Sequence, residues 1–225
     1  MNYLSHYYFD QQSNNPELIL GGLLPDLSHS FHKKAALKPG RHIIDLLQNP
    51  GTASLLRGWE RHKAIDKYFH NSSFFIQETA YLKSQIKPLF LNPGPYTFFM
   101  AHILLELCLD GMLLKTRKVD PVVLYQQLSK VERATLEKFF IFSESDNPTG
   151  FPLFLANFIS QGYLSRYIEP EGIIYSLDRI CERLWKTKFS KIEKTGLKKM
   201  IIKYMHRIEP GYLAIYDEIE KSGLP

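Results

Sequence analysis

The sequence predicts an all-α protein, a single helical domain over residues 1–225 with about eight to ten helices. Three observations lead to this prediction. The alternation of apolar and polar residues that half-buried strands show is scarce along the chain. Residues that start helices precede several apolar segments. The stretch 96–114 is the most hydrophobic part of the chain, and we expect it to form a central helix.

The N-terminal part should contain two helices followed by a loop. A short apolar helix is expected over residues 2–9. A second helix begins near Pro16, because proline is favoured in the first turn. It should end at Gly22, because Pro25 disfavours helical geometry in the residue before it. Residues 28–50 are polar and rich in turn signals, so we expect a long loop or lid there, with at most one turn of helix.

The rest of the chain reads as consecutive helices. Serine and threonine side chains cap a helix by accepting hydrogen bonds from its first backbone N–H groups, and such residues stand before the first two of these segments. The expected helices run from Thr52 or Ser54 to about Asn71, from Ser72 or Ser73 to Pro88, from Tyr96 to Leu114, and over residues 121–129, 130–142, 150–160, 170–187 and 190–221.

The composition bounds the class of protein. The 225 residues are 44% hydrophobic and 13% aromatic, enough for a sizeable core, and the net charge is +5. That charge permits an acidic partner, whereas no nucleic-acid-binding motif is present. Cys108 and Cys181 lie in apolar helical patterns, which favours buried free thiols over a disulfide. We see no signal peptide and no apolar run near the roughly 20 residues that span a bilayer, and so expect a cytoplasmic protein.

Two pairs of histidine and carboxylate point to a functional site. His62 and Asp66 are four residues apart, and so are His102 and Glu106. Residues with this spacing lie on one helical face, one turn apart. The second pair lies in a strongly apolar segment, where a glutamate is rarely buried unless it is paired or binds a metal. The first pair could instead be a surface ion pair, or Asp66 could orient the imidazole rather than bind a metal.

Upstream residues extend these pairs to a candidate metal site. The candidate ligands are His6, Asp26, His62, Asp66, His102 and Glu106, with His70 and Asp110 as possible additions. His6 could also be a core histidine, and Asp26 a helix cap. Imidazole with carboxylate suits Mn, Fe or Zn, and the lack of thiolate ligands argues against a structural zinc site. Six ligands would serve one or two ions, and a two-metal centre suits phosphoester hydrolysis, with Asp66 or Glu106 as the catalytic carboxylate.

Short motifs in the same segments resemble the acyl carrier protein phosphodiesterase family, all-helical hydrolases related to HD-domain phosphohydrolases. The motifs are Met1-Asn2-Tyr3-Leu4-Ser5-His6, Gly21-Gly22-Leu23-Leu24-Pro25-Asp26, the set Gly58, His62, Ile65 and Asp66, and the set Leu164, Arg166, Tyr167, Ile173, Leu177 and Arg183. The resemblance extends from residue 1 to about residue 185 and implies an HD-like helical fold.

This resemblance implies an activity and a cofactor. The expected reaction is hydrolytic release of 4′-phosphopantetheine from acyl carrier protein, a step connected with fatty acid biosynthesis, with a divalent metal, manganese first and iron or zinc as alternatives. His6, Asp26, His62 and Asp66 would be metal-binding or catalytic residues. The chain departs from the family pattern at Glu60, His70 and Leu107, and Glu106 falls roughly where the family has an aspartate.

Other functions remain open. The same pairs are similar to those of zinc-dependent phospholipase C, which is normally secreted and which we rank second because a signal peptide is lacking. The departures from the family pattern also fit a helical binding protein that has lost catalysis. On the substrate side, Arg166 and Arg183 are candidate phosphate-binding residues, because guanidinium binds phosphate through two hydrogen bonds. The eight basic residues between Lys186 and Arg207 are either a solvated face or a docking surface for an acidic carrier protein.

Overall fold

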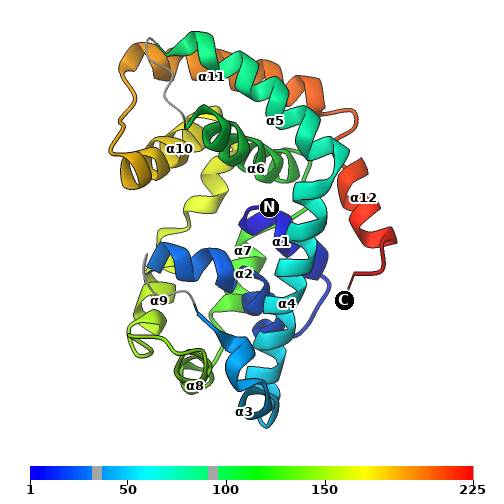
Figure 1. Cartoon of the computed structure of the whole chain (residues 1–225), viewed down its shortest axis with the longest axis vertical. Helices are drawn as coiled ribbons and strands as arrows, with labels where there is room; N and C mark the ends of the chain where they lie inside the picture. Colours follow the sequence, from blue (N-terminus) through cyan, green and yellow to red (C-terminus); the bar gives the residue numbers. More distant parts are fainter. Residues whose placement is uncertain (32–36, 91–95, 225) are drawn as a thin grey trace. The chain divides into compact units, whose positions relative to one another are not determined.

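The structure is a computed structural model that describes residues 1–31, 37–90 and 96–224. Within these residues every regular element is helical, which confirms the all-α prediction (Figure 1). The α-helices are α1 (Tyr3–Asp10), α2 (Pro16–Phe31), α3 (Ile43–Leu47), α4 (Pro50–Asn71), α5 (Ser73–Ile86), α6 (Thr97–Lys115), α7 (Pro121–Leu128), α8 (Arg133–Phe142), α9 (Phe151–Gln161), α10 (Pro170–Trp185), α11 (Lys191–Ile208) and α12 (Ala214–Lys221). The 3-10 helices are η1 (Pro39–His42), η2 (Lys87–Leu89) and η3 (Tyr163–Ile168).

The contacts of the chain divide it into two compact units, each built from segments that are distant in the sequence. Unit 1 comprises Met1–Ser5, Lys67–Lys118 and Leu164–Gly223. Unit 2 comprises His6–Asp66, Val119–Tyr163 and Leu224–Pro225. The single domain that the sequence predicts stays a prediction, and each unit is described by itself below.

Helix α6 is the core of unit 1, as the sequence predicts for its most hydrophobic stretch. Helices α5, α10 and α11 all pack against it. Its side chains from Leu104 to Leu114 are buried apart from Glu106. Helix α6 has 19 residues, and an 18-residue stretch of it has a mean hydropathy of 1.6, so by length and composition alone it could cross a membrane. This is weak evidence for a membrane span, because 72% of that stretch is buried inside the protein and a core helix has the same length and composition. The two cysteines are free and buried, which confirms the expectation of thiols.

Helix α2 does not end where the sequence predicts. It continues from Pro16 through Pro25 to Phe31, so the predicted end at Gly22 is wrong. A proline inside a helix removes one N–H donor and crowds the carbonyl four residues earlier, here that of Gly21. Burial of five leucine and isoleucine side chains of α2 outweighs this cost, because tertiary packing commonly overrides local preference.

The predicted loop over residues 28–50 is largely helical in the described residues. Its first four residues complete α2, and η1 and α3 occupy 39–47. Residues 32–36 of the predicted loop lie outside the described residues. The turn signals of this segment include Pro39 and Pro50, but each stands in the first turn of a helix, where its missing N–H costs nothing. Similarly, the single helix predicted over 190–221 is two helices, with Pro210 in the break between α11 and α12.

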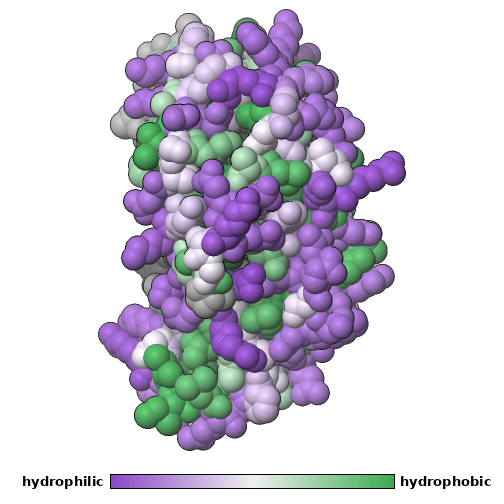
Figure 2. Space-filling model, turned by 90° about the vertical axis from the view of Figure 1, so that its right-hand side faces the viewer, coloured by the Kyte–Doolittle hydropathy of each residue, from purple (hydrophilic) through white to green (hydrophobic). Residues whose placement is uncertain are grey.

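The surface is mixed in character. Figure 2 shows a face on which hydrophilic side chains predominate and separate groups of hydrophobic side chains are interspersed. The exposed hydrophobic residues include Ile43, Ile44 and Leu47 of α3. Scattered exposed apolar side chains are normal on folded proteins.

Two glycines allow α2 and α4 to cross in close contact inside unit 2. A Cβ atom on Gly21 would lie 2.3 Å from the carbonyl oxygen of Leu55 and 3.0 Å from the Cα of Gly58. A Cβ atom on Gly58 would lie 2.2 Å from the carbonyl oxygen of Leu18. These atoms are backbone atoms, which cannot move aside as a flexible side chain can. Glycine is therefore required at both positions by the distance between the two helices.

We expect Gly58→Ala to separate α2 from α4 and to lower the free energy of unfolding by about 1–3 kcal/mol or more, the usual cost of overpacking. Urea unfolding followed by circular dichroism measures this change. Gly40→Ala is the control, because a Cβ atom there meets nothing within 4 Å. Equal stability of the two variants would contradict the close crossing.

Candidate functional site

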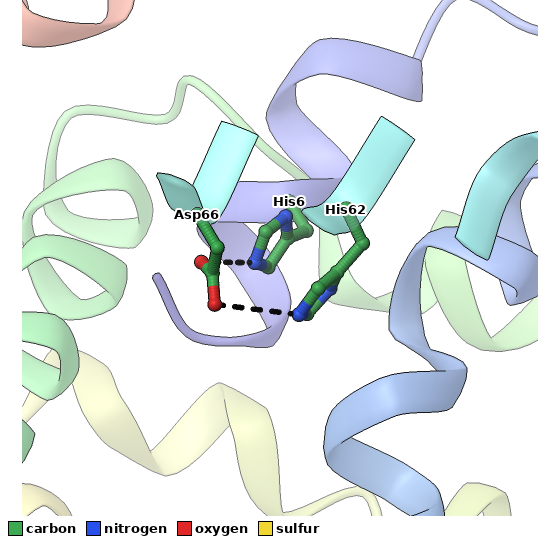
Figure 3. Close-up of side chains that lie close together, drawn as sticks. All are labelled: His6, His62 and Asp66. Carbon is green, nitrogen blue, oxygen red and sulfur yellow. Dashed lines mark hydrogen bonds and ion pairs between the residues drawn. The ribbon is translucent and has the colours of Figure 1, made fainter. Parts of the chain in front are cut away.

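Two histidines and one aspartate of unit 2 converge, and we call His6, His62 and Asp66 the His6 cluster (Figure 3). His6 comes from α1, whereas His62 and Asp66 lie one turn apart on α4. The Nε2 atom of His6 is 3.2 Å from Asp66 Oδ1, and the Nε2 atom of His62 is 3.5 Å from Asp66 Oδ2. The aspartate thus presents one oxygen to each imidazole, and the potential ligand atoms all lie within 4.8 Å of one another.

A backbone carbonyl determines the orientation of His62. Its Nδ1 atom lies 2.7 Å from the carbonyl oxygen of Gly22. A carbonyl only accepts hydrogen bonds, so Nδ1 carries the proton and donates it. In the neutral ring Nε2 then has a lone pair, and this lone pair faces Asp66. A histidine that donates one N–H to a carbonyl and directs the other nitrogen towards a shared position is typical of a metal ligand.

The position between His62 and Asp66 favours a positive charge. A lone pair and a carboxylate oxygen at 3.5 Å repel each other unless a proton or a metal ion lies between them. Burial lowers the pKa of His62, but Asp66 and Asp26 outweigh burial and raise this pKa above its ordinary value. Asp26 lies on α2 and contributes charge here, although it is not one of the three converging residues. Without a metal, the cluster therefore attracts a proton to His62.

His6 is the most buried member of the cluster. Its side chain is 1% exposed, and its ring is stacked on that of His62 with 3.7 Å between ring centroids. Burial, together with the neighbouring His62, lowers the pKa of His6 to about 3. Its Nδ1 atom has no hydrogen-bond partner among the described residues. His6 is therefore a neutral imidazole at pH 7, which is the form that binds metals.

Asp66 is the ionised member of the cluster. Burial raises the pKa of its carboxyl group, but hydrogen bonds to His6 and His62 help to hold this pKa well below its ordinary value. A second contact supports the geometry, since Arg61 of α4 lies 3.3 Å from the buried carboxylate of Asp10 at the end of α1. This ion pair holds α1 against α4 and so holds His6 near Asp66. The sequence contains no local signal for it, because the two residues are 51 positions apart in the chain.

Unit 1 contains a second group, which we call the His70 cluster: His70, His102 and Glu106. His70 is the last histidine of α4, and the other two lie one turn apart on α6. The Nε2 atoms of the two histidines are 3.1 Å apart, and they lie 3.2 Å and 2.9 Å from the same oxygen, Oε1 of Glu106. Burial raises the pKa of Glu106, but the Met1 amino group and the two histidines together lower it below its ordinary value.

The predicted site residues are thus divided between two groups. His6, His62 and Asp66 meet in unit 2, and His102 and Glu106 meet in unit 1, joined by His70, which the sequence marks only as possible. The sequence signals for His70 are its spacing of eight residues after His62 and its place at a position where the chain departs from the family pattern. Arg166 lies in η3 and Arg183 in α10, both in unit 1, and their role in phosphate binding stays a prediction.

Asp110, the other residue marked as possible, has contacts that are structural. It is fully buried, and its oxygens accept hydrogen bonds from the backbone N–H groups of Leu4 and Ser5 at 3.0 Å and 2.8 Å. The Ser5 hydroxyl donates a third bond to it. The first N–H groups of a helix have no partner within the helix, so Asp110 caps α1 from a distant segment.

The lowered pKa of His6 predicts a stability difference that depends on pH. The unfolded chain binds a proton at His6 below about pH 6.5, whereas the folded chain does so only near pH 3. Between these values the unfolded state binds more protons, so folding stability falls as the pH falls, by up to about 1.4 kcal/mol per pH unit from this group. In the presence of a chelator, His6→Gln should lose less stability than wild type between pH 6.5 and pH 4. Urea unfolding across this range measures the slopes, and parallel slopes would exclude a buried neutral His6.

Comparison with known proteins places the chain in a family. Residues 1–219 match the family described as acyl carrier protein phosphodiesterase. Searches of curated proteins and of solved structures gave no match. The matched range extends over nearly all of the 225 residues. The chain therefore belongs to the acyl carrier protein phosphodiesterase family.

Proposed function

We propose that this protein is a metal-dependent phosphodiesterase that releases 4′-phosphopantetheine from acyl carrier protein, with the His6 cluster as its metal site. The family supports the reaction and the carrier protein. The observation that carries the metal site is the hydrogen bond from His62 Nδ1 to the Gly22 carbonyl, which directs the other ring nitrogen towards Asp66. A histidine that only forms a hydrogen bond in the core uses one ring nitrogen, and nothing then requires its second nitrogen to face a carboxylate.

The donor set and its spacing fit a divalent transition-metal ion. Ligand atoms at about 2.0–2.2 Å from one ion lie roughly 3.0–3.5 Å from each other. The contacts of His6 and His62 with Asp66, at 3.2 Å and 3.5 Å, have this spacing. Two imidazoles and a carboxylate suit manganese, iron and zinc, and we propose manganese first. Such an ion lowers the pKa of water and neutralises charge on a phosphodiester.

The residues of the cluster divide the remaining tasks. His6 and His62 act as ligands rather than as bases: His6 is neutral and buried, and one nitrogen of His62 is held by a carbonyl. Asp66 is ionised and 27% exposed, the most accessible member of the three. It can accept a hydrogen bond from the attacking water and orient it. Asp26 adds negative charge beside His62, which further favours a cation.

The carrier protein would meet a basic surface on α11. Lys191, Lys199 and Lys203 are exposed along this helix, whereas Lys194 and Lys198 form ion pairs with Asp178 and Glu171. Unpaired surface charges mainly increase the rate at which an oppositely charged partner is encountered. Arg166 and Arg183 are proposed to bind phosphate oxygens of the substrate. The roles proposed for α11, Arg166 and Arg183 concern unit 1 alone, and the assignment of the metal ligands does not depend on them.

We expect Asp66→Asn to reduce the release of 4′-phosphopantetheine about 100-fold or more, because even residues that only support metal ligands typically contribute 10–100-fold. The helix content should change little, because asparagine has nearly the same shape. The assay follows the mass of holo-acyl carrier protein in the presence of manganese, and circular dichroism follows the fold.

Asp45→Asn is the matched control. It makes the same chemical change on an exposed side chain of unit 2, and this variant should keep full activity. Full turnover by Asp66→Asn would disprove the assignment of the site. A wild-type protein that binds no manganese, iron or zinc would instead favour a helical binding protein without catalysis.

A further inference from the structure

The His70 cluster has the geometry of a second metal site that is distinct from the His6 cluster. Three potential ligand atoms form a nearly equilateral triangle: His70 Nε2, His102 Nε2 and Glu106 Oε1, with edges of 3.1, 3.2 and 2.9 Å. Ligands at about 2.1 Å on neighbouring positions of an octahedron are about 3 Å apart. The triangle therefore corresponds to one face of an octahedral site, formed by two histidines and one carboxylate.

Hydrogen bonding alone accounts poorly for this arrangement. Oε1 of Glu106 lies close not only to both imidazole nitrogens but also to the Met1 amino nitrogen, at 3.0 Å. If both ring nitrogens carry protons, they face each other at 3.1 Å and one oxygen accepts from three donors; if one carries no proton, its lone pair faces the carboxylate oxygen. A cation bound by the two rings and the carboxylate resolves both conflicts, because two neutral imidazoles then direct lone pairs to the same position, while the Met1 amino group still donates to Oε1.

The two rings are held in place by an aromatic side chain. Phe75 of α5 is buried and contacts His70 and His102 edge-on, with 4.9 Å between ring centroids in each case. The interplanar angles are 76° and 86°, a preferred arrangement for aromatic pairs. Packing of this kind limits the rotation of both imidazoles, so the ligand atoms converge before any ion binds. Preorganised ligands are what a tight metal site requires.

The cluster is also accessible to an ion. The side chains of His70, His102 and Glu106 are 31%, 25% and 16% exposed. The partial exposure of all three side chains gives solvent access to the cluster. A site of two histidines and one carboxylate on one face, with the opposite face open, is typical of divalent iron and is also suited to manganese or zinc.

We propose that His70, His102 and Glu106 bind a divalent transition-metal ion in a site of their own. All three ligands belong to unit 1 and none is shared with the His6 cluster. The proposal therefore does not rest on the proposed phosphodiesterase activity. Its open coordination positions allow the ion to bind water or an oxygen-donor ligand such as phosphate.

Metal stoichiometry tests the proposal. Protein purified without a histidine tag is stripped with chelator and loaded in turn with manganese, iron(II) or zinc, and the bound metal is counted by plasma mass spectrometry. Wild type should bind two ions per chain, and His70→Gln/His102→Gln should bind one. His206→Gln is the control, because His206 is 69% exposed on α11, and it should bind as many ions as wild type. An unchanged metal content in the double variant would overturn the proposal.

A parallel variant separates this proposal from the proposed function. His62→Ala should lose the ion of the His6 cluster and retain that of the His70 cluster. If wild type binds a single ion that His62→Ala loses, the second site does not exist. If wild type binds a single ion that only the His70→Gln/His102→Gln variant loses, the second site stands and the proposed catalytic metal fails. No binding by wild type overturns both.

Glu106→Gln provides a measurement that does not depend on the double variant being folded. Glutamine has the shape of glutamate but is a weak metal ligand, so the Kd of one of the two ions should rise at least about 10-fold. Cobalt(II), whose visible absorption reports its ligands, gives a second readout: the spectrum of His62→Ala should lose intensity when Glu106 is also changed. An unaltered spectrum and Kd would contradict the proposal.

Discussion

The close crossing of α2 and α4 is the constraint on which the His6 cluster depends. Gly21 and Gly58 allow the two backbones to approach until a Cβ atom at either position would overlap a carbonyl oxygen. Only at this distance can the carbonyl of Gly22, the next residue of α2, accept a hydrogen bond from His62 of α4. Pro25, one turn later, supplies no N–H to α2, and burial of apolar side chains holds the helix together across it. A packing requirement thus determines the tautomer and direction of an imidazole.

Both clusters use the same physical arrangement, a carboxylate between two imidazoles. A buried carboxylate is costly unless it is paired, and a buried imidazole resists protonation. Asp66 and Glu106 each have a pKa below the ordinary value, and hydrogen bonds from the histidines beside them contribute to this lowering. His6 meanwhile is held neutral by burial. Such groups contribute little to stability as compared with apolar side chains of similar size, which is one ground for the two proposals that these clusters bind a cation.

The polar residues of α6 show why equal spacing does not mean equal roles. His102, Glu106 and Asp110 follow one another at intervals of four residues, a spacing that predicts one polar stripe along the helix. Successive steps of four residues advance by about 40° around a helix, so the stripe turns as it runs. Asp110 consequently meets the N–H groups at the start of α1, whereas Glu106 meets two imidazoles. One residue caps a helix and the other is a candidate ligand.

The sequence by itself determined the all-α class, the central helix α6, and the two histidine–carboxylate pairs, because helical periodicity is a local property that spacing reveals. The residues upstream of these pairs also indicated His6 and Asp26 as candidate ligands, and the resemblance of short motifs indicated the family. Only the tertiary structure decided that α2 continues through Pro25, that His70 joins His102 and Glu106, and that Asp110 is a cap. Each of these depends on contacts between residues far apart in the chain. Such contacts are set by which apolar faces pack together, and no local pattern encodes that choice.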